Sequence, residues 1–111
     1  MDTRFEIIRG GESSIGNFFG DIVRFYTGAD AVILNSGFLR SDCILDKGLI
    51  SLEILEKMIP IMDIILVLEV SGAELVAALE AGVSKYPSYD GRFPVTSGME
   101  FTFIGNGEPL K

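Results

Sequence analysis

Apolar side chains recur at helical spacing between Ser13 and Thr27, and this pattern predicts the first helix. Either Ser13 or Ser14 is a good N-cap, because a serine hydroxyl accepts a hydrogen bond from a free backbone N–H of the first turn. The apolar residues are Ile15, Phe18, Phe19, Ile22, Phe25 and Tyr26. Gly28 follows at once, and we expect it to end the helix.

Two further helices are predicted from serine N-caps that precede apolar faces. Ser51 begins the first, and Pro60 limits its continuation. Ser71 and Glu74 have the spacing of a capping box, which opens a helix to about Lys85. The apolar faces comprise Leu52, Leu55 and Ile59 in the first of these helices and Leu75, Leu79, Val83 and Tyr86 in the second.

Three apolar runs predict strands. Ala31 to Leu34 follows the first helix, Ile64 to Val70 is nearly continuous in apolar character, as in a central strand buried on both faces, and Met99 to Ile104 alternates. The predicted order is helix, strand, helix, strand, helix, strand. We therefore expect an α/β fold in which a mixed sheet is flanked by helices, formed by residues 1–111 as a single domain.

Composition changes this picture in one respect. Hydrophobic residues make up 48% of the 111 residues, and the mean hydropathy is +0.39. Either some apolar surface is covered by another domain or subunit, or the core is well filled. The longest apolar stretch, Ile59 to Val70, is interrupted by Pro60, Asp63 and Glu69, so it falls short of the ~20 apolar residues that a membrane span needs.

Charge and missing residue types exclude several functions. The net charge is -7, and the basic residues are scattered, so nucleic acid is not an expected partner. Histidine is absent, which excludes histidine-based acid–base catalysis and removes the commonest metal ligand. The single cysteine, Cys43, cannot form an internal disulfide and is interpreted as a core or surface thiol. No secretory signal precedes the first charged residues, so either the protein is cytosolic or its amino terminus is missing.

A candidate ligand site follows the first predicted strand. Asn35, Ser36 and Gly37 favour a sharp turn in which backbone N–H groups can face a bound anion. Arg40 then supplies a charge that persists at any ordinary pH. A strand, a small-residue turn and a cation together predict a ligand-binding site.

Four segments in register resemble the carboxy-terminal substrate-binding domain of the 5'-nucleotidase family, whose members include nucleotidases and UDP-sugar hydrolases. The first is Arg9-Gly-Gly-Glu-Ser-Ser-Ile-Gly-Asn17, and the second, Asn35-Ser-Gly-Phe-Leu-Arg40, is similar to a family loop of sequence Asn-Gly-Gly-Gly-Ile-Arg. The third is Ile59-Pro-Ile-Met-Asp63 with the ILVLEVSGAEL that follows it, and the fourth is Gly91-Arg-Phe with Val95-Thr-Ser-Gly98. The resemblance covers nearly the whole chain.

The resemblance implies a substrate site formed by Arg9, Asn35, Gly37, Arg40 and Ile61. Guanidinium groups can fork onto phosphate oxygens or sugar hydroxyls, an amide can donate to and accept from a ribose, and glycine allows close approach of the backbone. The alternative for both arginines is an ordinary surface salt bridge. For Asn17, the favoured interpretation is that it holds the helix start or loop together.

This chain also departs from the family pattern. Family members stack the base between two aromatic rings, and Ile61 replaces the first ring. The segment that carries the second ring follows the last strand, and this sequence ends at Lys111 without it. Each base–aromatic stack is worth roughly 1 to 3 kcal/mol, so nucleoside affinity is expected to be weakened. Phe38, which replaces a glycine of the family loop, either blocks the pocket or offers another ring.

The family hydrolyses phosphate esters with two divalent metal ions in a separate amino-terminal metallophosphoesterase domain. The resemblance therefore implies that this chain needs no cofactor of its own, that it binds a nucleotide or nucleoside, and that its partner is that domain, in an extracellular or periplasmic protein. The alternative is a packing or dimerisation module that has lost nucleotide binding and whose partner is a second copy in a homodimer. A free-standing small-molecule binder is a third interpretation.

Overall fold

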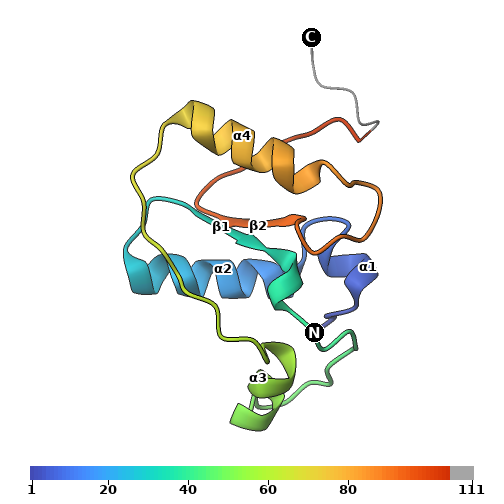
Figure 1. The fold of residues 1–111 in the computed structure, drawn as a ribbon. Coiled ribbons are helices and arrows are strands. Elements are labelled where there is room, and N and C mark those ends of the chain that lie inside the picture. The colour runs from blue at the N-terminus through green and yellow to red at the C-terminus, as the bar shows by residue number, and fades with distance from the viewer. Residues whose placement is uncertain (106–111) are drawn as a thin grey trace.

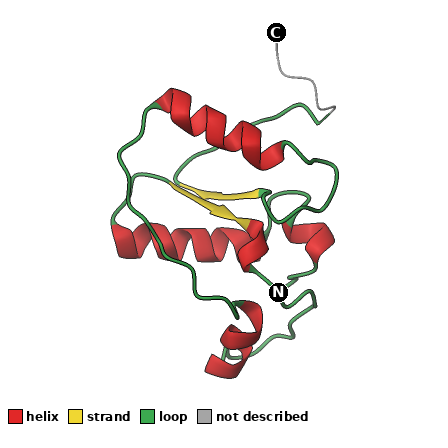
Figure 2. Ribbon diagram, viewed as in Figure 1, coloured by secondary structure: helices red, strands yellow, loops and turns green. Residues whose placement is uncertain are grey.

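The computed structural model describes residues 1–105, in which helices surround a small antiparallel sheet (Figures 1 and 2). The elements are α1 (Phe5–Ile8), α2 (Ser14–Thr27), β1 (Val32–Asn35), the 3-10 turn η1 (Ser36–Phe38), α3 (Leu52–Met58), α4 (Gly72–Val83) and β2 (Pro94–Ser97). The sheet pairs β1 with β2, and α2 and α4 lie on opposite sides of it (Figure 1). The predicted α/β class is confirmed, but among residues 1–105 the sheet is antiparallel and two-stranded, not mixed.

The three predicted helices are confirmed, because their start signals act locally. The Ser13 hydroxyl accepts a hydrogen bond from the Gly16 N–H at 3.1 Å, and Gly28 ends α2 in the left-handed conformation at φ 69°. Ser51 caps α3, and a reciprocal capping box of Ser71 and Glu74 opens α4. Helix α4 ends at Val83, two residues before the predicted end. No helix among residues 1–105 is long and apolar enough to cross a membrane.

Two of the strand predictions are wrong. Ile64 to Val70 and Met99 to Ile104 form no strand, and the second strand is instead Pro94–Ser97, paired in the register Val32 opposite Ser97. The side chains of Ile64–Val70 are exposed, although their pattern suggests a strand buried on both faces. Apolar and β-branched residues favour extended backbone, but a strand also requires a hydrogen-bonding neighbour, and no described strand pairs with either run.

Helix α2 packs very closely on β2 at two glycines one turn apart. A Cβ atom on Gly20 would lie 3.2 Å from Ser97 Cβ, and one on Gly16 would lie 3.2 Å from a methyl group of Val95. Larger side chains at these positions would push the helix away from the sheet. The Ser97 hydroxyl also donates to an Asp21 carboxylate oxygen of α2 at 2.6 Å.

The apolar core lies between α1, α2, α3 and the residue that follows η1. It consists of Ile8, Ile15, Phe19, Leu39 and Met58. Beside it, the first residues of the chain run antiparallel to residues 43–45, and the buried Thr3 hydroxyl donates to the Cys43 carbonyl oxygen at 2.7 Å. The core therefore fixes the position of Leu39. Leu39 in turn holds η1, which precedes it in the chain, and Arg40, which follows it. The glycine-rich end of the chain, residues 106–111, lies outside the described residues.

Candidate ligand-binding site

The turn η1 is held against the loop that precedes β2. The N–H of Ser36 donates to the Phe93 carbonyl oxygen and the N–H of Gly37 to the Gly91 carbonyl oxygen, both at 2.8 Å. A Cβ atom on Gly37 would lie 3.1 Å from Gly91 Cα, and one on Gly91 would lie 3.0 Å from Gly37 Cα. Gly37 and Gly91 therefore allow two backbone segments to lie in close contact. The Gly37 N–H donates its hydrogen bond to the Gly91 carbonyl oxygen within the chain.

Arg40 lies at the outer end of this turn. Its backbone N–H donates to the Met58 carbonyl oxygen at 2.8 Å, and its side-chain Nε donates to the Gly37 carbonyl oxygen at 2.7 Å. The side chain is exposed, and among the described residues no hydrogen bond or ion pair involves its two terminal nitrogens. Arg40 is thus oriented by the turn, while its two terminal NH2 groups have no partner among the described residues.

Arg9, at the end of α1, is held differently. Its guanidinium carbon lies 3.7 Å from the centroid of the Phe5 ring, which is a cation–π contact. One terminal nitrogen donates weakly to the Tyr89 carbonyl oxygen at 3.5 Å. The Nε atom is buried and has no hydrogen-bond partner among the described residues. A buried donor without an acceptor typically costs about 1 to 3 kcal/mol. A hydrogen-bond acceptor that reached the Arg9 Nε–H would therefore be bound favourably.

The electrostatics of Arg9 and Arg40 also favour an added anion. Burial lowers the pKa of Arg9, and the positive charge of Arg40 lowers it further, while the carboxylates of Asp42 and Asp90 act in the opposite direction. Two guanidinium groups that repel each other remain charged in proteins. A negative charge placed between them would offset both the repulsion and the desolvation. We call Arg9, Gly37, Arg40 and Gly91 the arginine cluster.

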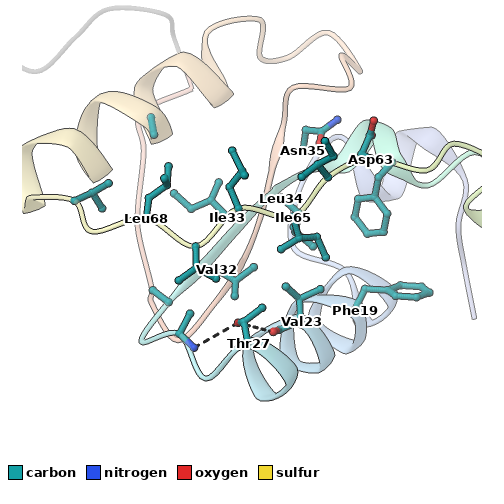
Figure 3. Close-up of a pocket in the computed structure, with 18 of the residues that line it drawn as sticks. Phe19, Val23, Thr27, Val32, Ile33, Leu34, Asn35, Asp63, Ile65 and Leu68 are labelled. Atoms are coloured by element: carbon teal, nitrogen blue, oxygen red, sulfur yellow. Dashed lines mark hydrogen bonds between the residues drawn. The ribbon is translucent and has the colours of Figure 1, made fainter.

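The other two predicted site residues are Asn35 and Ile61, and the amide nitrogen of Asn35 would lie 3.3 Å from a Cβ atom on Gly37, so Asn35 borders the arginine cluster. Both line a mostly apolar hollow of about 560 Å³ between α2, β1, α4 and residues 59–70 (Figure 3). Figure 3 shows Asn35 and Asp63 at one end of this hollow. Arg9 and Arg40 are not among its lining residues. The hollow and the arginine cluster are therefore two groups of residues, and Asn35 borders both.

Phe38 and Asn17 each make a contact within the chain that indicates a structural role. The Phe38 ring meets the Phe19 ring of α2 edge to face, with centroids 5.6 Å apart, and also lines the hollow. The Asn17 amide donates to a Glu12 carboxylate oxygen at 2.8 Å. This contact ties the loop before α2 to the helix, in agreement with the favoured interpretation of Asn17.

Sequence reasoning assigned no role at the site to Asp42, and it named Gly91 only as part of the fourth resembling segment. Asp42 adopts φ 44°, and its carboxylate accepts a hydrogen bond from the Phe5 N–H at 2.8 Å, which fixes the start of α1 and so the position of Arg9. Gly91 faces Gly37. Neither contact had a sequence signal beyond the residue type, because each joins segments more than 35 residues apart. Within residues 1–105, no group of three His, Cys, Asp or Glu side chains could hold a metal ion.

Comparison with known proteins defines the class. The chain matches the family model described as 5'-nucleotidase, C-terminal domain, over residues 2–109. It therefore belongs to this family. It is also 32% identical over 113 residues to the trifunctional nucleotide phosphoesterase protein YfkN of Bacillus subtilis (strain 168). The alignment covers 98% of this chain but only 8% of that relative. No solved structure gave a significant match.

Proposed function

We propose that this domain binds the nucleotide or nucleoside part of the substrate of a metal-dependent phosphoester hydrolase. The observation that carries the proposal is Arg9, whose buried Nε lacks a partner while its pKa is lowered by burial and by the neighbouring charge of Arg40. A bound phosphate or a row of sugar hydroxyls would supply the missing acceptor. Family membership and a nucleotide phosphoesterase relative support the same class of ligand.

The proposed roles follow from the two groups of residues. Arg9 and Arg40 bind phosphate oxygens or sugar hydroxyls, because a guanidinium presents several donors in a fixed plane. Gly37 keeps the backbone turn close to Gly91, which holds Arg40 in place. Asn35 and Ile61 contact the remainder of the nucleoside at the end of the hollow, where Ile61 gives apolar contact without ring stacking. Affinity is therefore expected to be modest.

Hydrolysis itself is assigned to another domain. Two divalent metal ions in an amino-terminal metallophosphoesterase domain would activate the attacking water and stabilise the leaving oxygen. The residues of this chain bind and orient the ligand. By this proposal the isolated chain binds nucleotides without hydrolysing them.

The test is a calorimetric titration of the chain with AMP. Arg40→Ala is expected to weaken binding about 10-fold or more, because a hydrogen bond to a charged group is worth about 1.5 to 3 kcal/mol. The free energy of unfolding should stay within about 0.5 kcal/mol of wild type, since the side chain is exposed. Lys57→Ala, which removes an exposed cation paired with Glu53 on α3, is the matched control and should leave binding unchanged. Equal affinity of all three proteins would contradict the proposed site.

A second candidate function is a packing or dimerisation module that has lost nucleotide binding. The internal contacts of both arginines favour it, because Arg9 stacks on Phe5 and Arg40 donates to Gly37, as structural arginines do. This candidate predicts no heat of AMP binding and a stable dimer in sedimentation experiments. A monomer that binds AMP through Arg40 would exclude it.

A further inference from the structure

Helix α2 carries apolar side chains on the face that is turned away from the sheet. Its inner face packs on β2 at Gly16 and Gly20. The opposite face lies on the outside of the fold (Figure 1) and bears four large apolar side chains at helical spacing, which we call the aromatic stripe. The stripe consists of Phe18 and Ile22, each 45% exposed, and of Phe25 and Tyr26, which are 90% and 89% exposed.

The aromatic stripe is separate from the candidate ligand site. The α2 residues that line the hollow include Phe19, Val23 and Thr27, which lie on another side of the helix. A helix that is apolar on all sides is generally buried, and a contiguous exposed apolar patch generally marks a contact site. Aromatic side chains in particular are enriched in protein–protein interfaces. The stripe therefore indicates a contact with another protein surface.

The charges near the stripe indicate that this surface is a second copy of the chain. From Ser13 to Ala29 the sequence has one acidic residue, Asp21, and one basic residue, Arg24. This segment is therefore neutral, although the whole chain carries a net charge of -7. An apolar face in neutral surroundings can meet its own copy without bringing an excess of like charge together.

Asp21 and Arg24 also have groups available for a second copy. Both residues are exposed, three positions apart along one flank of the stripe. One Asp21 carboxylate oxygen accepts from the Ser97 hydroxyl, and the Arg24 Nε donates to the Asp30 carbonyl oxygen. Among residues 1–105, the other carboxylate oxygen and the two terminal nitrogens of Arg24 form no hydrogen bond. These groups can therefore pair between copies.

The position of the two charges selects an antiparallel arrangement. When two α2 helices pack face to face and antiparallel, the same flank of each helix meets. With the two-fold axis between residues 22 and 23, Asp21 of each copy lies opposite Arg24 of the other. A parallel pair would place these flanks on opposite sides of the contact, where the two charges do not meet.

We infer that the aromatic stripe is the interface of a homodimer in which two α2 helices pack antiparallel. A covered aromatic side chain buries about 150 to 250 Å², so the exposed parts of the stripe amount to about 500 Å² per copy and about 1,000 Å² for the pair. This area is near the lower limit of specific interfaces, so the dissociation constant is expected to be on the order of 10 to 100 µM.

The test is sedimentation equilibrium of the chain at concentrations from about 5 to about 500 µM. The mass should rise from 12.1 kDa toward twice this value as the concentration increases. Phe25→Glu places a carboxylate in the stripe and should weaken association at least 10-fold. Leu49→Glu is the matched control, because Leu49 is 94% exposed outside the stripe, and it should leave association unchanged. A monomer at all concentrations, or a dimer that survives Phe25→Glu, would overturn the inference.

Cysteine cross-linking tests the antiparallel arrangement, with Cys43→Ser in each variant to remove the native thiol. Ile22→Cys should form a disulfide-linked dimer under mild oxidation, because the two copies of residue 22 lie beside the two-fold axis. Tyr26→Cys should not, because the two copies of residue 26 lie about 10 Å apart along the helix axis. Cross-linking of Tyr26→Cys without cross-linking of Ile22→Cys would overturn the antiparallel dimer.

The dimer and the proposed nucleotide site can be tested independently. Phe25 is not among the residues that line the hollow and does not belong to the arginine cluster, so Phe25→Glu should bind AMP as the wild type does. Loss of association in this variant with unchanged AMP binding supports the dimer. Failure of the wild-type chain to bind AMP would contradict the proposed function and would leave the sedimentation result unaffected.

Discussion

Two parts of this domain are rich in apolar residues and have opposite environments. In the first, α2 packs on the sheet at Gly16 and Gly20, and the core residues Ile8, Ile15 and Leu39 are at most 1% exposed. In the second, the apolar strip of residues 62–70 exposes every apolar side chain. The packed part positions the arginine cluster, whereas the strip contributes one wall of the hollow. Apolar sequence alone therefore does not determine which segment becomes core, because burial depends on the presence of a surface that fits.

The largest expected difference between the two parts comes from one substitution made in each. Leu39→Ala removes a fully buried side chain and should lower the free energy of unfolding by about 2 to 5 kcal/mol. Leu66→Ala in the strip should change it by no more than about 0.5 kcal/mol. Urea denaturation of the isolated chain measures both values. A similar loss for the two variants would show that the strip is buried in solution and would break the comparison.

The next effect concerns the end of β2. Gly98 has φ 76°, and a Cβ atom there would collide with the Asp30 carbonyl oxygen. Gly98→Ala should therefore cost roughly 1 to 3 kcal/mol of stability in thermal or urea unfolding. Gly48→Ala, at a position with no atom near the added methyl group, should stay within about 0.5 kcal/mol of wild type. Unchanged stability of Gly98→Ala would mean that the packed part is looser than we describe.

Removing an N-cap should act differently in α2, which belongs to the packed part, and in α4, which follows the strip. Ser13→Ala and Ser71→Ala each remove a helix cap worth about 1 kcal/mol. Helix α2 contains four buried residues, so Ser13→Ala should lower the global free energy of unfolding. Helix α4 contains none, so Ser71→Ala should mainly speed amide exchange within α4. Equal effects on global stability would show that α4 unfolds together with the packed part.

The smallest effect is a dependence on pH. The Arg4 guanidinium lowers the pKa of Asp2, and the backbone N–H of Arg92 lowers that of Asp90, both below the ordinary value of 3.8. Because these folded-state values are depressed, the stabilisation is present at neutral pH and is lost as the pH falls below 3.8. Urea unfolding at a series of pH values should show this decline, with a shallower slope for Asp2→Asn. An identical slope in that variant would argue against the Asp2–Arg4 contact.

The helices were predictable from sequence because their signals are local. Ser13, Ser51 and Ser71 each bond to a backbone N–H three residues away, so residue order alone specifies the cap. The strands were harder, because β1 pairs with a segment some 60 residues later in the chain. Nothing in the composition of Ile64–Val70 shows whether a partner strand exists, and Pro94–Ser97 is too short and too polar to stand out as a strand.

The candidate site was likewise predictable only in part. The turn after β1 and the cation of Arg40 were visible from residue types, and the resemblance added Arg9. That Arg9 lies close enough to Arg40 for their charges to interact depends on long-range contacts, namely the Asp42 carboxylate at the start of α1 and the Gly37–Gly91 approach. Asn35 and Ile61 line the hollow, whereas Arg9 does not, and spacing along the chain does not indicate this division.

The most direct test of the central claim is the NMR signal of the Arg9 side-chain Nε–H group during a titration with AMP. This donor is buried and without a partner among the described residues, so a bound phosphate or ribose that supplies the acceptor should shift the signal saturably. Sodium chloride at matched ionic strength is the control and should leave it unchanged. A signal that does not move while AMP is added to millimolar concentration would contradict the account of Arg9 as a ligand-binding residue.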